Sequence, residues 1–114
     1  MRIPSFIPIE KAVLHVVVVA GAADFLAAGL TPHGDRAVVT FRVQVLCSGA
    51  GIYSAVITRG GVAVVGTVLG GAAIAANDWV QFDVFAHAGD TVNFRHSVGG
   101  NVTLRVREIW GGVE

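Results

Sequence analysis

The chain has 114 residues, of which 54% are hydrophobic and 14% charged, and its 8 basic and 8 acidic residues leave no net charge. Soluble domains usually carry about 25% charged residues. The composition therefore excludes an intrinsically disordered segment, and the chain lacks the basic excess with which proteins bind nucleic-acid backbones. A single cysteine excludes an internal disulfide framework and a cysteine-based zinc site. The length fits one domain.

Residues 1–11 are predicted to form an extended N-terminal arm. Proline removes a backbone donor and favours extended geometry, and apolar residues surround the two prolines of this segment. An apolar arm that is not helical must lie on something, and its own domain and a neighbouring subunit are equally good candidates. The arm residues expected at such an interface are Ile3, Pro4, Phe6, Ile7 and Pro8.

Residues 12–30 are the most apolar stretch of the chain. A membrane helix needs about 20 apolar residues, and His15 and Asp24 interrupt this one, so no membrane span is expected. A secretory signal with a cleavage site at residues 20–22 is the rival interpretation. Its charged region would be long and would hold two prolines, so we expect a chain made in the cytoplasm and not exported by this route, while cleavage within residues 1–22 stays open.

The chain from residue 12 to residue 110 is predicted to be a single all-β domain, with 111–114 as a C-terminal tail. Apolar and polar residues alternate with the period of a half-buried strand, as in Phe41, Val43 and Val45. Paired glycines supply the positive φ angles of hairpin turns. Eight or nine short strands predict an antiparallel β-sandwich. The candidate strands are 12–20, 22–28, 37–47, 52–59, 62–69, 72–76, 79–86, 91–96 and 101–109.

Three pieces of the chain resemble a known family. They are the strand Phe41-Arg42-Val43-Gln44-Val45, the strand Tyr53-Ser54-Ala55-Val56-Ile57 with the Arg59-Gly60-Gly61 hairpin, and the strand from Phe82 that leads into Ala88-Gly89-Asp90-Thr91-Val92. The pattern resembles compact jelly-roll sandwiches of the tumour-necrosis-factor and complement-C1q kind, and similar modules in viral capsid and decoration proteins. The resemblance implies a jelly-roll-like sandwich that closes with copies of itself, with a trimer as the favoured form.

The residues that could carry chemistry show no catalytic or metal-binding pattern, so we expect neither an enzyme nor a bound metal or cofactor. The four histidines, His15, His33, His87 and His96, lack the local spacing of metal ligands. His96 shares its strand face with apolar residues and is expected to cap the edge of the core. Asp90 follows a glycine and is interpreted as a turn residue that bonds nearby backbone. Cys47 is interpreted as a buried, inert thiol.

The surface carries the functional evidence. Four arginines fall on the polar sides of their strands and would form a basic stripe, partly balanced by Asp83 and Glu108, if those strands are neighbours. A solvated face is the plain interpretation, and a contact face for an acidic partner the sharper one. These arginines are Arg42, Arg95, Arg105 and Arg107. Apolar residues also fall on nominal outer faces, which predicts burial in subunit contacts. They are Val38, Leu46, Trp79, Phe85 and Ile109, with Trp110 in the tail.

These observations predict a homo-oligomeric structural protein. The first hypothesis is a virion protein of a phage or archaeal virus, synthesised in the host cytoplasm, which packs non-covalently with its own copies and other virion proteins as a capsid decoration, minor capsid or spike-base protein. The second is a receptor- or carbohydrate-binding module, with Trp79, Trp110 and Tyr53 as the candidate aromatic platform. The third is a subunit of an extracellular fibre that joins by donating its first strand to the sheet of the next subunit.

Overall fold

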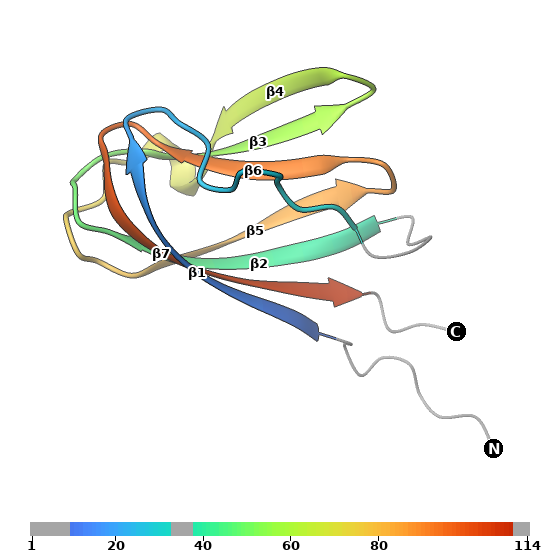
Figure 1. Ribbon diagram of the computed structural model, residues 1–114, viewed down its shortest axis with the longest axis horizontal. Helices are drawn as coiled ribbons and strands as arrows, with labels where there is room; N and C mark the ends of the chain where they lie inside the picture. The colour runs from blue at the N-terminus through green and yellow to red at the C-terminus, as the bar shows by residue number, and fades with distance from the viewer. Residues whose placement is uncertain (1–9, 33–37, 111–114) are drawn as a thin grey trace.

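The structure, a computed structural model, describes residues 10–32 and 38–110 (Figure 1). Within these ranges the chain forms seven strands and one short 3₁₀ turn, which confirms the predicted all-β class. They are β1 (Glu10–Ala20), β2 (Val38–Cys47), β3 (Tyr53–Arg59), β4 (Val62–Thr67), η1 (Leu69–Gly71), β5 (Val80–His87), β6 (Thr91–His96) and β7 (Gly99–Trp110).

The strands form two antiparallel sheets. One has the order β1-β7-β2-β5 and the other β4-β3-β6. The last strand lies between the first and the second, and the chain crosses repeatedly from one sheet to the other, which is the interleaving of a jelly roll. In the right half of Figure 1, β4, β3 and β6 lie above β5, β2, β7 and β1, and β1 and β7 curve upward at the left. The predicted jelly-roll-like sandwich is therefore confirmed.

The segment 22–30 occupies the free edge of β6, but it is not the predicted strand 22–28. Its backbone bonds β6 at intervals, from Ala22 N–H to the His96 carbonyl (2.8 Å), from Phe25 N–H to Phe94 (2.9 Å) and from Leu30 N–H to Val92 (2.7 Å). Between these points the chain bends, and positive φ angles at Ala22 and Gly29 break the extended geometry that a ladder needs. The segment fills the eighth strand position of the jelly roll without strand geometry.

The predicted strand 72–76 is also wrong. This stretch is a loop with one isolated bridge, between Ile74 and Gly51. It follows a turn in which Leu69, Gly70 and Gly71 all have positive φ, so the backbone enters it already bent. The predicted hairpin between β3 and β4 is confirmed, because Gly60 and Gly61 both adopt the positive φ that such a turn requires.

The core follows the predicted alternation. Every second residue of β2, β5, β6 and β7 points inward and is buried, and aromatic rings link the two sheets. Phe94 lies between Phe82 of the opposite sheet and Phe25 of the segment 22–30, with ring centroids 6.0 and 6.5 Å away. Because β2, β5, β6 and β7 bury their inner faces, the outer faces and the sheet edges are where function must be sought.

Candidate assembly surfaces

Strand β4 is an exposed sheet edge without the usual protection. All six of its residues are exposed, including Val62 and Val64, each 64% accessible, and Val65 at 49%. The strand reads VAVVGT and carries no charge and no proline. Natural edge strands are blunted by lysine, proline, bulges or a covering loop, since unpaired backbone groups recruit another strand. The β4 edge is therefore a ready acceptor for an added strand.

The register shows which backbone groups of β4 are free for such pairing. Val68 donates a hydrogen bond to the Tyr53 carbonyl (3.1 Å), so the bonded pairs recur at every second residue from there. The backbone groups of Val62 and Val64 consequently face β3. Those of Ala63, Val65 and Thr67 face the open edge. An antiparallel strand could bond to these last three residues without disturbing the existing sheet.

The inner side of β4 is hollow. Val64 lies opposite Ile57, which packs against the core, yet Val64 itself is mostly exposed because no strand of the other sheet covers it. Ile57, Arg59, Val62 and Val64 line a hollow of about 330 Å³. Figure 1 shows the β3–β4 hairpin at the margin of the sandwich, on the side of β3 away from β6. The core thus ends in an unfilled apolar notch beside the unprotected edge.

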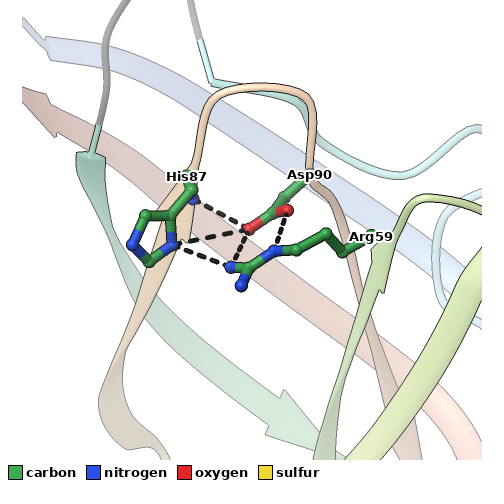
Figure 2. A network of polar contacts seen from close by, with 3 residues as sticks. All are labelled: Arg59, His87 and Asp90. Carbon is green, nitrogen blue, oxygen red and sulfur yellow. Dashed lines mark hydrogen bonds and ion pairs between the residues drawn. The ribbon is translucent and has the colours of Figure 1, made fainter.

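A polar clasp closes the end of this notch (Figure 2). Arg59, at the end of β3, binds both carboxylate oxygens of Asp90, each at 2.8 Å. The same carboxylate accepts the backbone N–H of His87 at 2.8 Å, and an Arg59 guanidinium nitrogen lies 2.8 Å from the His87 ring nitrogen Nδ1. The hydrogen bonds from Arg59, followed by the one from the His87 N–H, hold the pKa of Asp90 well below its usual value. The clasp fixes the β5–β6 turn against β3.

The sequence predicted one of the two kinds of contact that Asp90 makes. The carboxylate does bond nearby backbone within its turn, as expected. Its bidentate pair with Arg59 was missed, because 31 residues separate the two and only the sheet pairing of β3 with β6 brings them together. The side chain of Asp90 is fully buried, whereas that of Arg59 is 62% exposed, so the arginine covers the carboxylate from the solvent side.

Substituting Asp90→Asn is expected to lower the melting temperature at neutral pH by several degrees, because the bidentate ion pair is lost. A carboxylate whose folded pKa is depressed stabilises the fold above its ordinary pKa of about 3.9, and that contribution disappears as the pH falls further. The difference between wild type and variant in thermal unfolding should therefore narrow below about pH 4. Asp83→Asn, which breaks a half-exposed pair with Arg42, is the matched control and should change little.

The predicted arginine stripe is only partly formed. Arg42, Arg105 and Arg107 share the outer face of the β1-β7-β2-β5 sheet, with Arg42 directly opposite Arg107 in the register. Arg95 does not belong to it, because β6 pairs with β3 in the other sheet, where Arg95 binds Asp24 at 2.6 Å. The expectation that Glu108 balances the stripe is also wrong. Its strand parity places it on the inner face, where it is buried.

Three of the predicted apolar outer-face residues are exposed, whereas Leu46 and Ile109 are half-buried. Trp79 and Phe85 are 57% and 63% exposed, and Val38 is exposed as well. Tyr53 is different. It is buried against His96, with ring centroids 4.8 Å apart, and burial raises the pKa of Tyr53 to about 12. Tyr53 therefore cannot belong to an exposed aromatic platform, and that part of the carbohydrate hypothesis is wrong.

Several predicted interface residues lie outside the described part of the structure. They are the arm residues Ile3, Pro4, Phe6, Ile7 and Pro8, and the side chain of Trp110. The backbone of Trp110 ends β7 and pairs with Val39, so this residue belongs to the sheet and not to a separate tail.

Two further candidate residues, Cys47 and His96, are buried in the core. Cys47 is buried and its thiol donates to the Gly99 carbonyl at 3.4 Å, as the interpretation of an inert thiol requires. His96 was expected at the edge of the core, but its side chain is fully buried. Its Nδ1 accepts the backbone N–H groups of Gly99 (2.9 Å) and Val98 (3.2 Å), and burial lowers its pKa. Among the described residues, His, Cys, Asp and Glu nowhere gather in a group of three suited to a metal ion.

Over the same residues, no helix has both the length and the apolar character needed to cross a membrane.

Comparison with known proteins finds a structural likeness only. No family model matches the chain, and no curated protein matches its sequence. A solved structure from Bacillus endospore appendages, which form a novel family of disulfide-linked pili, is similar with a TM-score of 0.53 and 15% identity. The match covers 94% of this chain and 89% of the other. The two proteins share the β-sandwich fold over nearly their whole lengths.

Proposed function

We propose that this protein is a structural subunit that joins copies of itself non-covalently into an extracellular fibre, by addition of a strand from one copy to the β4 edge of the next. The observation that carries the proposal is the uncharged, fully exposed β4 edge beside an unfilled apolar hollow. β-Strand addition supplies affinity through main-chain hydrogen bonds and specificity through pockets for alternate side chains. The β4 edge offers both.

The N-terminal arm has the sequence that this acceptor needs. In an extended strand the backbone N–H groups of alternate residues point to the same side. Pro4 and Pro8 would therefore both turn their missing donors away from β4, and the odd-numbered residues from Ile3 to Ile9 would turn theirs toward it. Proline is tolerated on the free side of an edge strand. The arm would complete the sheet and also close it against further strands.

The same parity would put Phe6 of the arm in the hollow. In an antiparallel pair, directly opposed residues share a face. Arm residues whose N–H groups point away from β4 lie opposite Val62 and Val64, on the inner face. Phe6, between the two prolines, then fills the space lined by Ile57 and these two valines. Burial of one aromatic side chain in such a site stabilises the contact by about 1.5–3 kcal/mol.

The topology favours donation to a second copy. β1 is an edge strand, and the segment that follows it runs along β6, at the edge of the other sheet opposite β4. β1 and segment 22–30 thus make one flank of the sandwich, and β4 lies on the other. An arm that enters β1 on one flank and binds β4 on the other flank of a neighbour makes a head-to-tail contact, which generates an open polymer or a ring.

The linkage differs from what is known of the structural neighbour. The appendage pili are disulfide-linked. Here the single cysteine, Cys47, is buried and bonded to a backbone carbonyl, so its sulfur is not presented to another subunit. Assembly through β4 should accordingly withstand reducing agents. The virion location, the trimer and the virion partners stay predictions from the family resemblance. A head-to-tail contact that closes after three copies would give that trimer.

A complementation experiment tests the proposal. One variant lacks residues 1–8 and can accept an arm but not donate one. The other carries Val64→Lys, which places a charged side chain at the apolar hollow. This variant can donate an arm but not accept one. Each should be monomeric by light scattering, whereas the wild-type protein forms polymers visible by electron microscopy. An equimolar mixture of the two variants should give heterodimers and nothing larger, because only one productive contact is available.

Val98→Lys is the matched control, since Val98 is 60% exposed in the β6–β7 turn and lies on no sheet edge. It should polymerise like the wild type. A monomeric wild-type protein at all concentrations, or polymers from either variant alone, would contradict the proposal. So would the absence of heterodimers from a mixture of two folded variants.

A further inference from the structure

A second hollow lies on the outer face of the four-stranded sheet, away from the β4 edge. It has a volume of about 290 Å³ and is lined by Gln44, Trp79, Val80, Gln81 and Arg105. The register explains the grouping, because Arg105 of β7 lies opposite Gln44 of β2, and Gln44 lies opposite Gln81 of β5. Three strands therefore place one cation and two amides in a single row, and Trp79, just before β5 and two residues from Gln81, also lines the hollow.

One hydrogen bond joins the two amides and leaves the oxygen of one and the amino group of the other without a partner in the pair. The Gln44 amide nitrogen donates to the Gln81 carbonyl oxygen at 3.1 Å. The Gln44 carbonyl and the Gln81 amino group then remain available side by side. Exchanging the oxygen and nitrogen positions in both amides gives the same result with the roles reversed. A row of one donor and one acceptor matches two adjacent hydroxyl groups, each of which can both donate and accept.

Arg105 differs from the other arginines of the described strands. Arg42, Arg59 and Arg95 each bind an aspartate, at 2.6 to 3.0 Å. Over residues 10–32 and 38–110, the Arg105 guanidinium has no hydrogen bond or ion pair. An unpaired guanidinium is a bidentate donor set shaped for a carboxylate.

Trp79 adds an apolar surface to this polar row. Its side chain is 57% exposed next to the hollow, although a tryptophan is among the side chains that gain most from being covered. A pyranose ring has one face of C–H groups, which packs on an indole, and a rim of hydroxyl groups. The volume is at the small end of the range for ligand pockets, about 300–1,000 Å³, and suits one ring.

We propose that this hollow, named here the Trp79 pocket, binds a pyranose that bears a carboxylate, such as a uronic acid residue of an acidic polysaccharide. The indole of Trp79 stacks on the ring, the Gln44–Gln81 pair bonds two adjacent hydroxyls, and Arg105 pairs with the carboxylate. The proposal is independent of the proposed function, because none of the four residues belongs to β4, to the hollow behind it or to the arm. A subunit that assembles would display the pocket once per copy, and the weak single-site binding would gain by avidity.

The test is a titration of the arm-deleted protein, followed by two-dimensional NMR, with a trisaccharide of galacturonic acid and with the neutral galactose trisaccharide as comparator. Signals of the Trp79 indole and of the Gln44 and Gln81 side-chain amides should shift with the acidic sugar. We expect a dissociation constant on the order of 1 mM, typical of a single small site. Trp79→Ala should weaken the binding at least tenfold, and Arg105→Gln should remove the preference for the acidic sugar over the neutral one.

Arg42→Gln and Phe85→Ala are the matched controls, since they change an arginine and an exposed aromatic residue of the same sheet face outside the pocket. Both should bind like the parent protein. The proposal would be overturned if neither sugar shifts the pocket signals, or if Arg42→Gln loses as much affinity as Arg105→Gln. A short acidic peptide that shifts the same signals more strongly than the sugar would also overturn it. A variant is folded if its signals outside the pocket match those of the wild type. Trp79→Phe, which keeps an aromatic ring, should retain part of the binding.

Discussion

Replacing Phe94 with alanine is expected to lower the free energy of unfolding by about 3–5 kcal/mol, the usual cost of deleting a buried phenylalanine ring. Phe94 is 1% exposed and lies between Phe82 of the opposite sheet and Phe25 of the irregular segment. Its loss removes contacts on both sides and leaves a cavity that strands fixed by hydrogen bonds cannot close. The total free energy of unfolding of such domains is about 5–15 kcal/mol, so the variant should be barely stable.

Urea unfolding followed by fluorescence measures this effect, with light scattering on the same samples to hold the state of association constant. Phe85→Ala is the control, because it deletes the same ring from a side chain that is 63% exposed. It should change the free energy of unfolding of the dissociated protein by no more than about 0.5 kcal/mol. Equal losses for the two variants would show that Phe94 does not organise the core in the way described.

Replacing Asn93 with alanine is expected to lower the free energy of unfolding by about 2–3 kcal/mol. This is a large effect for a polar residue that lies on the face of β6 opposite to Val92 and Phe94. Its amide binds both backbone groups of Leu26, accepting from the N–H at 3.0 Å and donating to the carbonyl at 2.6 Å. It also accepts the N–H of Phe94 at 2.9 Å. Because Leu26 and Asn93 are buried, removal of the amide leaves donors and an acceptor without partners and without water.

At Leu26 the segment 22–30 is held by this amide, between the backbone bonds that Phe25 and Leu30 make to β6. Hydrogen exchange of the Leu26 amide should therefore accelerate in Asn93→Ala by much more than exchange in β2 or β7. Asn101→Ala deletes the same group from an exposed position on β7 and is the control. If Leu26 exchanges no faster in Asn93→Ala than in Asn101→Ala, the Asn93 amide does not hold the segment, which then depends on its backbone bonds to β6 and its apolar packing.

The sequence predicted well what depends on local periodicity. The alternation in β2, β5, β6 and β7 identifies which side chains are buried, because a strand presents successive residues to opposite faces. It placed Phe41, Val43 and Val45 in the core, and Gly60 and Gly61 in a hairpin. It failed for segment 22–30 and for 72–76, which are short alanine-rich stretches, and alanine has no preference for strands. The bends there are set by contacts with β6 and with Gly51, which are distant in sequence.

Taken alone, the sequence determined that this protein is an all-β domain, and its proline-bearing apolar N-terminus and low charge predicted an arm and a surface buried by assembly. Only the tertiary structure decided which strand is the unprotected edge, that Arg59 reaches Asp90, that Arg95 leaves the arginine stripe, and that Trp79 and Arg105 line one hollow. Strand parity is a property of neighbouring residues and can be read along the chain. Sheet order is set by pairing across tens of residues, and the surfaces proposed for assembly and for sugar binding exist only after that pairing is made.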